Sequence, residues 1–136
     1  MKKNEINSNG LSSKYLRYLS KKCLSKPAPI LPCDHFFMLR TLPTNSSYII
    51  NLDNSPGSHY VAVIVKKEYV WYFDSIGLPP GLSMNSNILN RLKRTRKDIV
   101  WSKKSVQAIN SLFCGFYCMS FLVKCAHEKG EVQALC

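Results

Sequence analysis

The stretch "HYVAVIVKKEYVWYFDS", residues 59–75, carries the clearest fold signal in the chain. Two runs of β-branched and aromatic residues, 59–65 and 69–75, flank the polar tripeptide 66–68, which is the pattern of a β-hairpin. The first run is apolar on both of its alternating faces, so it should form a central strand that is covered on each side. We therefore expect the hairpin to form the middle of a sheet that is flanked by helices.

Outward from the hairpin, helical and extended patterns alternate along the chain. Apolar residues recur near helical spacing over 11–24, which predicts a small amphipathic helix, and the proline-rich segment 25–32 then breaks it. Further elements are expected as a helical turn or loop in 33–43, a strand at 47–53, a basic helix in 85–97, a strand at 98–106 and an apolar helix after Cys114. This order predicts an α+β fold with a mostly antiparallel central sheet.

The chain length of 136 residues suits one domain, 1–136, in which the polar segment 1–10 is expected to be a disordered tail. The longest apolar run, near 112–123, is too short for a membrane span, and the basic N-terminus has no apolar stretch typical of a secretory signal. We expect an intracellular protein with no membrane partner.

Six cysteines without a secretory signal favour free thiols in a reducing compartment. Cys118 and Cys125 follow the interior of the C-terminal helix and are interpreted as core thiols. Together with Cys114 and His127 they could be proposed as a zinc site, but their spacing does not suit the usual pairs of zinc ligands. No metal is predicted.

The net charge of +11 is concentrated in 1–26 and 91–104. Clusters of this density are typical of contact with nucleic acid or another polyanion, although a solvated basic surface that keeps the protein soluble is the alternative. The candidate DNA-binding residues of the second cluster are Arg91, Lys93, Arg94, Arg96, Lys97, Lys103 and Lys104.

The register of the hairpin predicts a side-chain pair. If the turn centres on Lys66 and Lys67, His59 lies directly opposite Asp74, with the two Cβ atoms about 4.5–5.5 Å apart. A three-residue turn would break this alignment. An aspartate can fix the tautomer of a histidine, and the resulting imidazolium can stabilise a thiolate.

Cys114 is the candidate thiolate because it precedes an apolar helix, and helix N-termini favour anions. Gly115 would let a substrate carbonyl approach the backbone closely, and Gln107 could donate its amide to an oxyanion. Each residue alone has a simpler interpretation: His59 can be satisfied by water and Asp74 can initiate a turn. Only the set of residues predicts cysteine acyl-transfer chemistry.

Three stretches resemble the adenovirus-type (adenain-like) cysteine proteases, particularly those of Maverick/Polinton elements and related viruses. They are "YIINLDNSPGSHYVAVIV" (48–65), "YVWYFDSIGLPP" (69–80) and "SVQAINSLFCGFYCMSFL" (105–122). They match the family's Pro-Gly-x-His strand, its Tyr-Phe-Asp-Ser-x-Gly-x-Pro-Pro segment and its Gln-x6-Cys-Gly-x-Tyr-Cys helix. The six residues between Gln107 and Cys114 favour this branch over SUMO-specific proteases, which usually have one fewer.

The resemblance implies a papain-like or SUMO-protease-like core with His59 as base, Asp74 as its orienting acid and Cys114 as nucleophile at the start of a buried helix. It implies an oxyanion hole of Gln107 and the Cys114 amide. The implied activity is a cysteine endopeptidase that cleaves virion precursor proteins after small residues such as Gly, in the virion and the host nucleus or cytoplasm. The resemblance also implies that no cofactor is required and that DNA or a viral peptide can stimulate the enzyme.

The chain departs from the family at three points. Tyr60 replaces the usual Trp after the histidine, and both residues can pack as an aromatic lid. No cysteine lies between Cys33 and Cys114, so an activating peptide would not be disulfide-linked as in adenovirus. The chain also ends soon after the cysteine helix, which suggests a minimal enzyme or one that needs a partner to complete its fold. Two alternatives stay open: a SUMO- or ubiquitin-like-modifier protease, and a catalytically lapsed, DNA-associated virion protein.

Overall fold

The structure is a computed structural model that describes residues 6–7, 10–11, 13–52, 59–77, 80, 87–101 and 114–128. Its elements are β1 (Ile6–Asn7), β2 (Gly10–Leu11), α1 (Ser13–Cys23), β3 (Ile30–Pro32), α2 (Cys33–Met38), β4 (Ser46–Asn51), β5 (Tyr60–Val65), β6 (Tyr69–Phe73), α3 (Asn87–Lys93), β7 (Asp98–Trp101) and α4 (Cys114–Glu128). From α1 onward the order of helices and strands matches the predicted order where the chain is described, apart from the short strand β3, which lies in the proline-rich segment 25–32. The antiparallel pair β1–β2 lies partly within the segment predicted as a disordered tail. None of the helices in the described residues is long and apolar enough to span a membrane.

The main sheet has five strands in the order β3-β4-β5-β6-β7. β5 is antiparallel to both of its neighbours, whereas the outer pairs β3–β4 and β6–β7 are parallel. The α+β class is therefore confirmed, but the sheet is mixed, and only its three central strands are antiparallel. The parallel pairs arise because α2 and α3 carry the chain from one end of the sheet back to the other before β4 and β7 begin.

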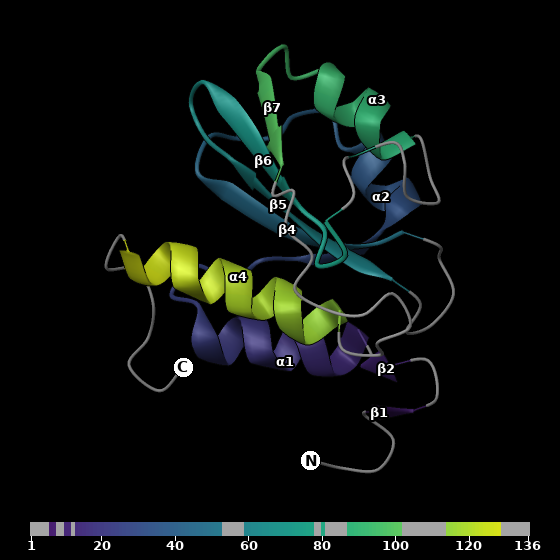
Figure 1. Ribbon diagram of the computed structural model, residues 1–136, viewed down its shortest axis with the longest axis vertical. Coiled ribbons are helices and arrows are strands. Elements are labelled where there is room, and N and C mark those ends of the chain that lie inside the picture. Colours follow the sequence, from purple (N-terminus) through teal and green to yellow (C-terminus); the bar gives the residue numbers. More distant parts are fainter. Residues whose placement is uncertain are drawn as a thin grey trace.

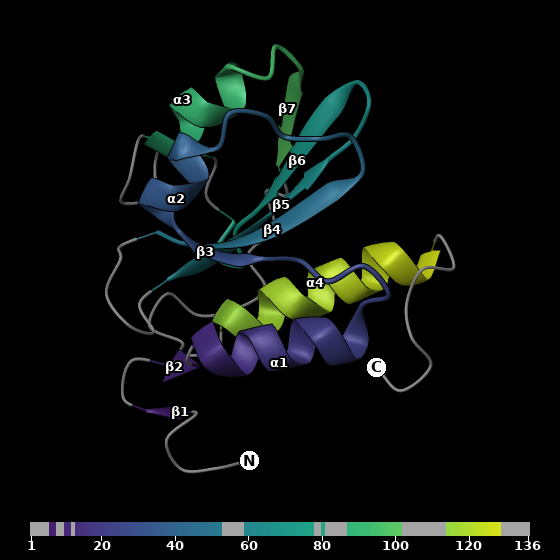
Figure 2. The same cartoon turned by 180° about the vertical axis from the view of Figure 1, so that it is seen from behind.

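Two helical layers cover the sheet, as Figures 1 and 2 show from opposite sides. α2 and α3 lie on one face, and α4 lies on the other with α1 packed beside it. All six residues of β5 are buried, which confirms that this run is a central strand covered on both sides. Tyr60, Ala62 and Ile64 belong to the core beneath α4, whereas Val61, Val63 and Val65 belong to the core beneath α2 and α3.

The hairpin register differs from the predicted one. Val65 pairs with Val70, and the N–H of Lys66 donates to the carbonyl of Tyr69 at 2.8 Å, so the turn centres on Lys67 and Glu68. If this register is continued, the residue opposite Asp74 is two positions after His59, and not His59 itself. The predicted direct opposition is therefore wrong. The turn is held where it is by β7, since the Asp98 N–H donates to the carbonyl of Glu68.

The strand β3 forms one edge of the sheet. It is only three residues long, it is preceded by Pro29, and it ends at Pro32, which directly precedes α2. The Ile49 N–H of β4 donates to the Pro29 carbonyl at 3.0 Å and starts the parallel pairing. A short strand flanked by prolines is the usual form of an exposed sheet edge.

Candidate active site

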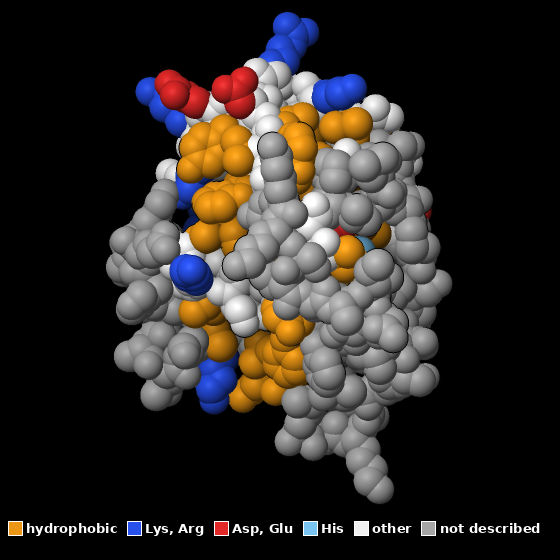
Figure 3. Space-filling view, in the orientation of Figure 1, with side chains coloured by type: hydrophobic (Ala, Val, Ile, Leu, Met, Phe, Trp, Pro, Cys, Tyr) orange, Lys and Arg blue, Asp and Glu red, His pale blue; other side chains and the backbone are white. Residues whose placement is uncertain are grey.

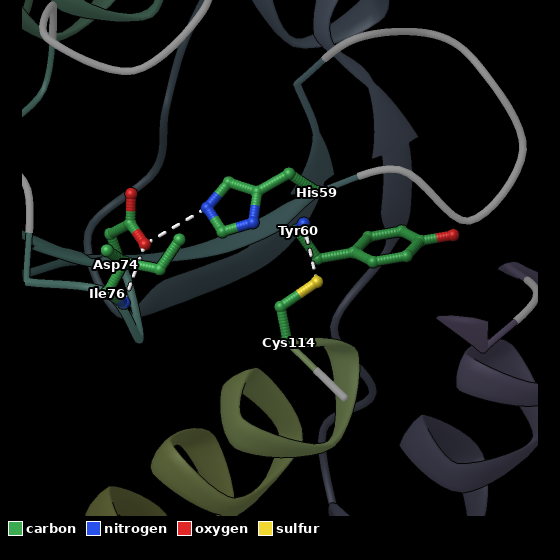
Figure 4. A network of polar contacts seen from close by, with 5 residues as sticks. All are labelled: His59, Tyr60, Asp74, Ile76 and Cys114. Atoms are coloured by element: carbon green, nitrogen blue, oxygen red, sulfur yellow. Dashed lines mark hydrogen bonds and ion pairs between the residues drawn. The ribbon is translucent and has the colours of Figure 1, made fainter. Parts of the chain in front are cut away.

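His59 and Asp74 meet at one end of the sheet, directly before β5 and directly after β6. The imidazole Nε2 lies 3.0 Å from Asp74 Oδ1 (Figure 4). The predicted contact is thus present although the register is shifted by two residues. A shift of two keeps side chains on the same face of the sheet, and diagonal neighbours on one face can still reach each other.

The Asp74 carboxylate is fully buried and held in orientation by the turn that follows it. Its Oδ1 accepts a second hydrogen bond, 2.9 Å long, from the Ile76 N–H, and the Gly77 N–H donates to the Asp74 carbonyl at 2.8 Å. Gly77 has a φ of 89°, a conformation that glycine adopts without strain. Asp74 therefore both initiates a turn and binds His59. Its Oδ2 has no partner among the described residues.

Cys114 is the first residue of α4, as predicted, and its side chain is buried beside β5. Its Sγ accepts a 3.2 Å hydrogen bond from the main-chain N–H of Tyr60, the residue that follows His59 (Figure 4). Both the helix N-terminus and an N–H donor stabilise negative charge on sulfur. The site therefore provides two independent stabilising interactions for a thiolate.

His59 lies between the carboxylate and the thiol. Burial lowers the pKa of its imidazole, but hydrogen bonding to Asp74 and interaction with Cys114 outweigh burial and raise the pKa to about 9. Nε2 faces Asp74, and Nδ1 lies on the side of the ring that faces Cys114 (Figure 4). An Nε2–H that donates to the carboxylate leaves Nδ1 to exchange a proton with the thiol. This arrangement places a histidine that can exchange a proton between the carboxylate and the sulfur.

Gly115 has a structural role different from the predicted one. A Cβ atom at this position would lie 3.0 Å from Cδ1 and 3.2 Å from Cδ2 of Leu16. The side of Gly115 that a side chain would occupy is therefore filled by α1. The glycine lets α1 and α4 pack closely, and the expectation that it opens the backbone to a substrate carbonyl does not describe its environment.

Several predicted site residues lie outside the described residues. They are Gln107, the candidate oxyanion donor, and the basic residues Lys103 and Lys104. The backbone N–H of Cys114 is at the first position of α4, where N–H groups have no acceptor within their own helix. That amide is the oxyanion donor the described part of the site can offer.

The described members of the basic cluster have different environments. Arg91 is only 3% exposed. Arg94 donates to the carbonyls of Phe37 and Leu39 at the C-terminal end of α2, and its guanidinium lies over the Phe37 ring. Lys97 donates from Nζ to the Lys66 carbonyl at 2.5 Å.

Of the cluster's described residues, only Lys93 and Arg96 are exposed with no polar contact assigned to their side chains. On the face drawn in Figure 3 the Lys and Arg side chains are separated by apolar ones rather than gathered in one patch.

Sequence reasoning missed the two contacts that tie the site to its surroundings. One is the Tyr60 amide on Cys114, which depends on how far apart β5 and α4 lie and has no local signal. The other is α1, whose Leu16 packs on the residue after Cys114. The only available signal was the Cys-Gly pair itself, since glycine in a helix suggests a close approach of another segment.

Comparison with known proteins adds no relative: no protein-family model matches the chain, and no curated protein matches it significantly. Within the described residues, no three His, Cys, Asp or Glu side chains form a group that could hold a metal ion. His59, Asp74 and Cys114 are the described residues whose geometry indicates a chemical function.

Proposed function

We propose that this protein is a cysteine endopeptidase with Cys114 as nucleophile, His59 as general base and acid, and Asp74 as the orienting carboxylate. The observation that carries the proposal is that a buried carboxylate, a histidine and a cysteine from three separate parts of the chain meet in that order. Neither packing nor turn formation requires all three together. The resemblance to adenain-like proteases assigns the same three residues.

The reaction follows from these contacts. The Cys114 thiolate attacks the scissile carbonyl carbon, forming a C–S bond and placing negative charge on the carbonyl oxygen. The Cys114 N–H, and Gln107 by resemblance, bind that oxyanion. Imidazolium of His59 gives its proton to the leaving amine as the C–N bond breaks. His59 then takes a proton from water, and the hydroxide releases the acyl group and restores the thiolate.

The proposed substrate class comes from the resemblance to adenain-like proteases. We expect virion or capsid precursor proteins to be cleaved after small residues such as Gly. DNA or a viral peptide would stimulate the reaction, and a peptide would bind without a disulfide. If DNA binds, Lys93 and Arg96 are its expected contacts among the described basic residues because their charged groups are exposed.

The test is hydrolysis of fluorogenic peptides that end in Gly-Gly before the reporter, together with cleavage of a capsid precursor. Cys114→Ala should abolish turnover, and His59→Ala should nearly do so. Cys118→Ala is the matched control, because Cys118 is also buried and lies one turn further along the same helix. Turnover that survives in Cys114→Ala would show that the assignment is wrong.

The two alternatives predict different outcomes in the same assay. A modifier protease would cleave SUMO or ubiquitin-like conjugates faster than capsid precursors and short peptides. A lapsed, DNA-associated virion protein would bind DNA but would turn over none of these substrates, even with DNA and a viral peptide present. The burial and orientation of Asp74 favour an active site, because a lapsed enzyme has no need to keep a buried carboxylate beside a histidine.

A further inference from the structure

Helix α1 packs against the first turn of α4, where Cys114 lies. Leu16 of α1 is fully buried against Gly115. The ring of Tyr15 meets that of Phe116 edge-on, with centroids 6.4 Å apart. Gly115 and Phe116 directly follow Cys114, so α1 contacts the helix at the two positions next to the proposed nucleophile.

The same helix also reaches the residue that donates to the sulfur. Tyr60 is 1% exposed, and its hydroxyl shares a 2.9 Å hydrogen bond with Oγ of Ser13, the first residue of α1. The main-chain N–H of Tyr60 is the group that binds Cys114 Sγ. In Figure 4 the Tyr60 ring extends away from the sulfur while its amide faces it. A single buried side chain therefore connects the start of α1 with the amide at the nucleophile.

The hydrogen bond between Ser13 and the Tyr60 hydroxyl holds the Tyr60 ring in place. A buried phenol hydroxyl without a partner is costly, so the Tyr60 ring is held where Ser13 can meet it. A held ring restrains the position of Tyr60 at the start of β5, together with the pairing of Tyr60 and Asn51, and thereby helps to place the N–H. The Tyr60 ring is buried and its hydroxyl is engaged by Ser13, so both residues can act through the amide and the first turn of α4.

We infer that α1 is a positioning element of the active site, and that Tyr60 and Ser13 are positioning residues that set where the Cys114 sulfur lies relative to His59. The inference rests on the proposed function, since it concerns the reactivity of the proposed nucleophile. It assigns α1 a role that its sequence, an ordinary amphipathic helix, does not reveal.

The experiment measures alkylation of each cysteine in the full-length chain by iodoacetamide from pH 5 to 9, read by mass spectrometry. Ser13→Ala and Tyr60→Phe should each slow Cys114 alkylation at pH 6.5 by about three- to tenfold, the effect of one hydrogen bond, and move its profile to higher pH. The double variant should be no slower than either single variant. Ser13→Thr keeps a hydroxyl and should restore the rate.

Tyr48→Phe is the matched control. It removes the hydroxyl of another buried tyrosine, which packs edge-on against Phe36 beneath α2 on the opposite face of the sheet. This variant should leave the pH profile of Cys114 unchanged. If Tyr48→Phe slowed Cys114 alkylation as much as Tyr60→Phe, loss of any buried tyrosine hydroxyl would have the same effect. That result would overturn the inference.

Three further outcomes are decisive. If Ser13→Ala and Tyr60→Phe accelerate the alkylation of buried Cys118, the contact only holds the fold together and the positioning role is wrong. If wild-type Cys114 reacts fast below pH 8 but neither variant alters it, the inference fails and the proposed function stands. If wild-type Cys114 reacts no faster than Cys23, the proposed function fails and the inference fails with it.

Discussion

The main-chain N–H of Tyr60 donates a hydrogen bond to the sulfur of Cys114 across 54 positions of sequence. The donor adjoins His59, so the residue after the proposed base binds the proposed nucleophile. The start of β5 and the start of α4 are thereby joined by a main-chain hydrogen-bond donor as well as by side chains. A main-chain donor survives every substitution except proline, which makes this part of the site tolerant of sequence change.

Asp74→Asn should lower kcat/KM for peptide hydrolysis by about 10²- to 10⁴-fold, because an amide cannot provide the negative charge that stabilises the imidazolium of His59. Asn keeps an oxygen that can accept the Ile76 N–H, so the turn should persist. Steady-state kinetics and thermal unfolding of the same samples separate the two effects. A variant with near wild-type kcat/KM would remove Asp74 from the mechanism.

The stability of the protein should decrease as the pH rises from 6.5 to about 9. Burial lowers the pKa of His59, but Asp74 and Cys114 outweigh burial and raise it to about 9, above the value of about 6.5 in an unfolded chain. The folded state thus holds this proton more tightly. Its stabilising contribution is complete below pH 6.5 and is lost as the pH passes through about 9. Urea unfolding at intervals across this range measures the loss.

His59→Gln is the control for that pH dependence, since it removes the titrating group and leaves the other ionisable side chains in place. Its free energy of unfolding should vary less between pH 6.5 and 9 than that of the wild type. An equal decrease in both proteins would assign the pH dependence to other groups.

Gly115→Ala should destabilise the fold by roughly 1–3 kcal/mol, as expected for overpacking, although alanine is usually the better residue in a helix. The sign is set by Leu16, which is fully buried and lies 3.0 Å from the added Cβ. In a Leu16→Ala background the same substitution should become neutral or stabilising. Denaturant unfolding of the four proteins measures the coupling, and additive effects would refute the contact.

Arg94→Ala should cost about 0.5–1 kcal/mol of stability, because it removes the hydrogen bonds to the carbonyls at the end of α2 and the contact with the Phe37 ring. Arg96→Ala, at an exposed position in the same cluster, should change stability little. Arg96→Ala should instead weaken DNA binding, measured at fixed salt. If Arg96→Ala lowered stability and left DNA affinity unchanged, the cluster would not be divided between a structural Arg94 and a DNA-binding Arg96.

Cys118 should resist alkylation up to about pH 9 in the folded protein. Burial raises its pKa well above the usual value, with the neighbouring Cys114 and Asp74 adding to the effect. In 6 M guanidinium it should react like any other thiol. Fast reaction of Cys118 in the native protein would mean that α4 opens readily.

The sequence predicted the parts of this fold that depend on local pattern. The alternation and composition of residues 59–75 were sufficient for a central hairpin strand, and the Cys-Gly pair was sufficient for the start of α4. The register was wrong by two because the turn position depends on β7, a distant segment, and the polar residues 66–68 do not specify it. The His59–Asp74 contact survived because an error of two keeps both side chains on one face.

The mixed sheet and the docking of α1 could not be predicted in the same way. Whether β3 and β7 pair in parallel depends on where α2 and α3 pack, which is a property of the whole fold. The sequence could not show that Arg91 is buried or that the exposed Arg94 binds carbonyls at the end of α2, because both depend on how α3 packs.

The proline-flanked edge strand β3 has a consequence for the protein at high concentration. Pro29 and Pro32 lack an N–H and Ile30 is buried, so β3 offers few main-chain donors to a neighbouring molecule. A short edge of this kind disfavours edge-to-edge pairing with another copy at this side of the sheet, so we expect association at high concentration to avoid β3.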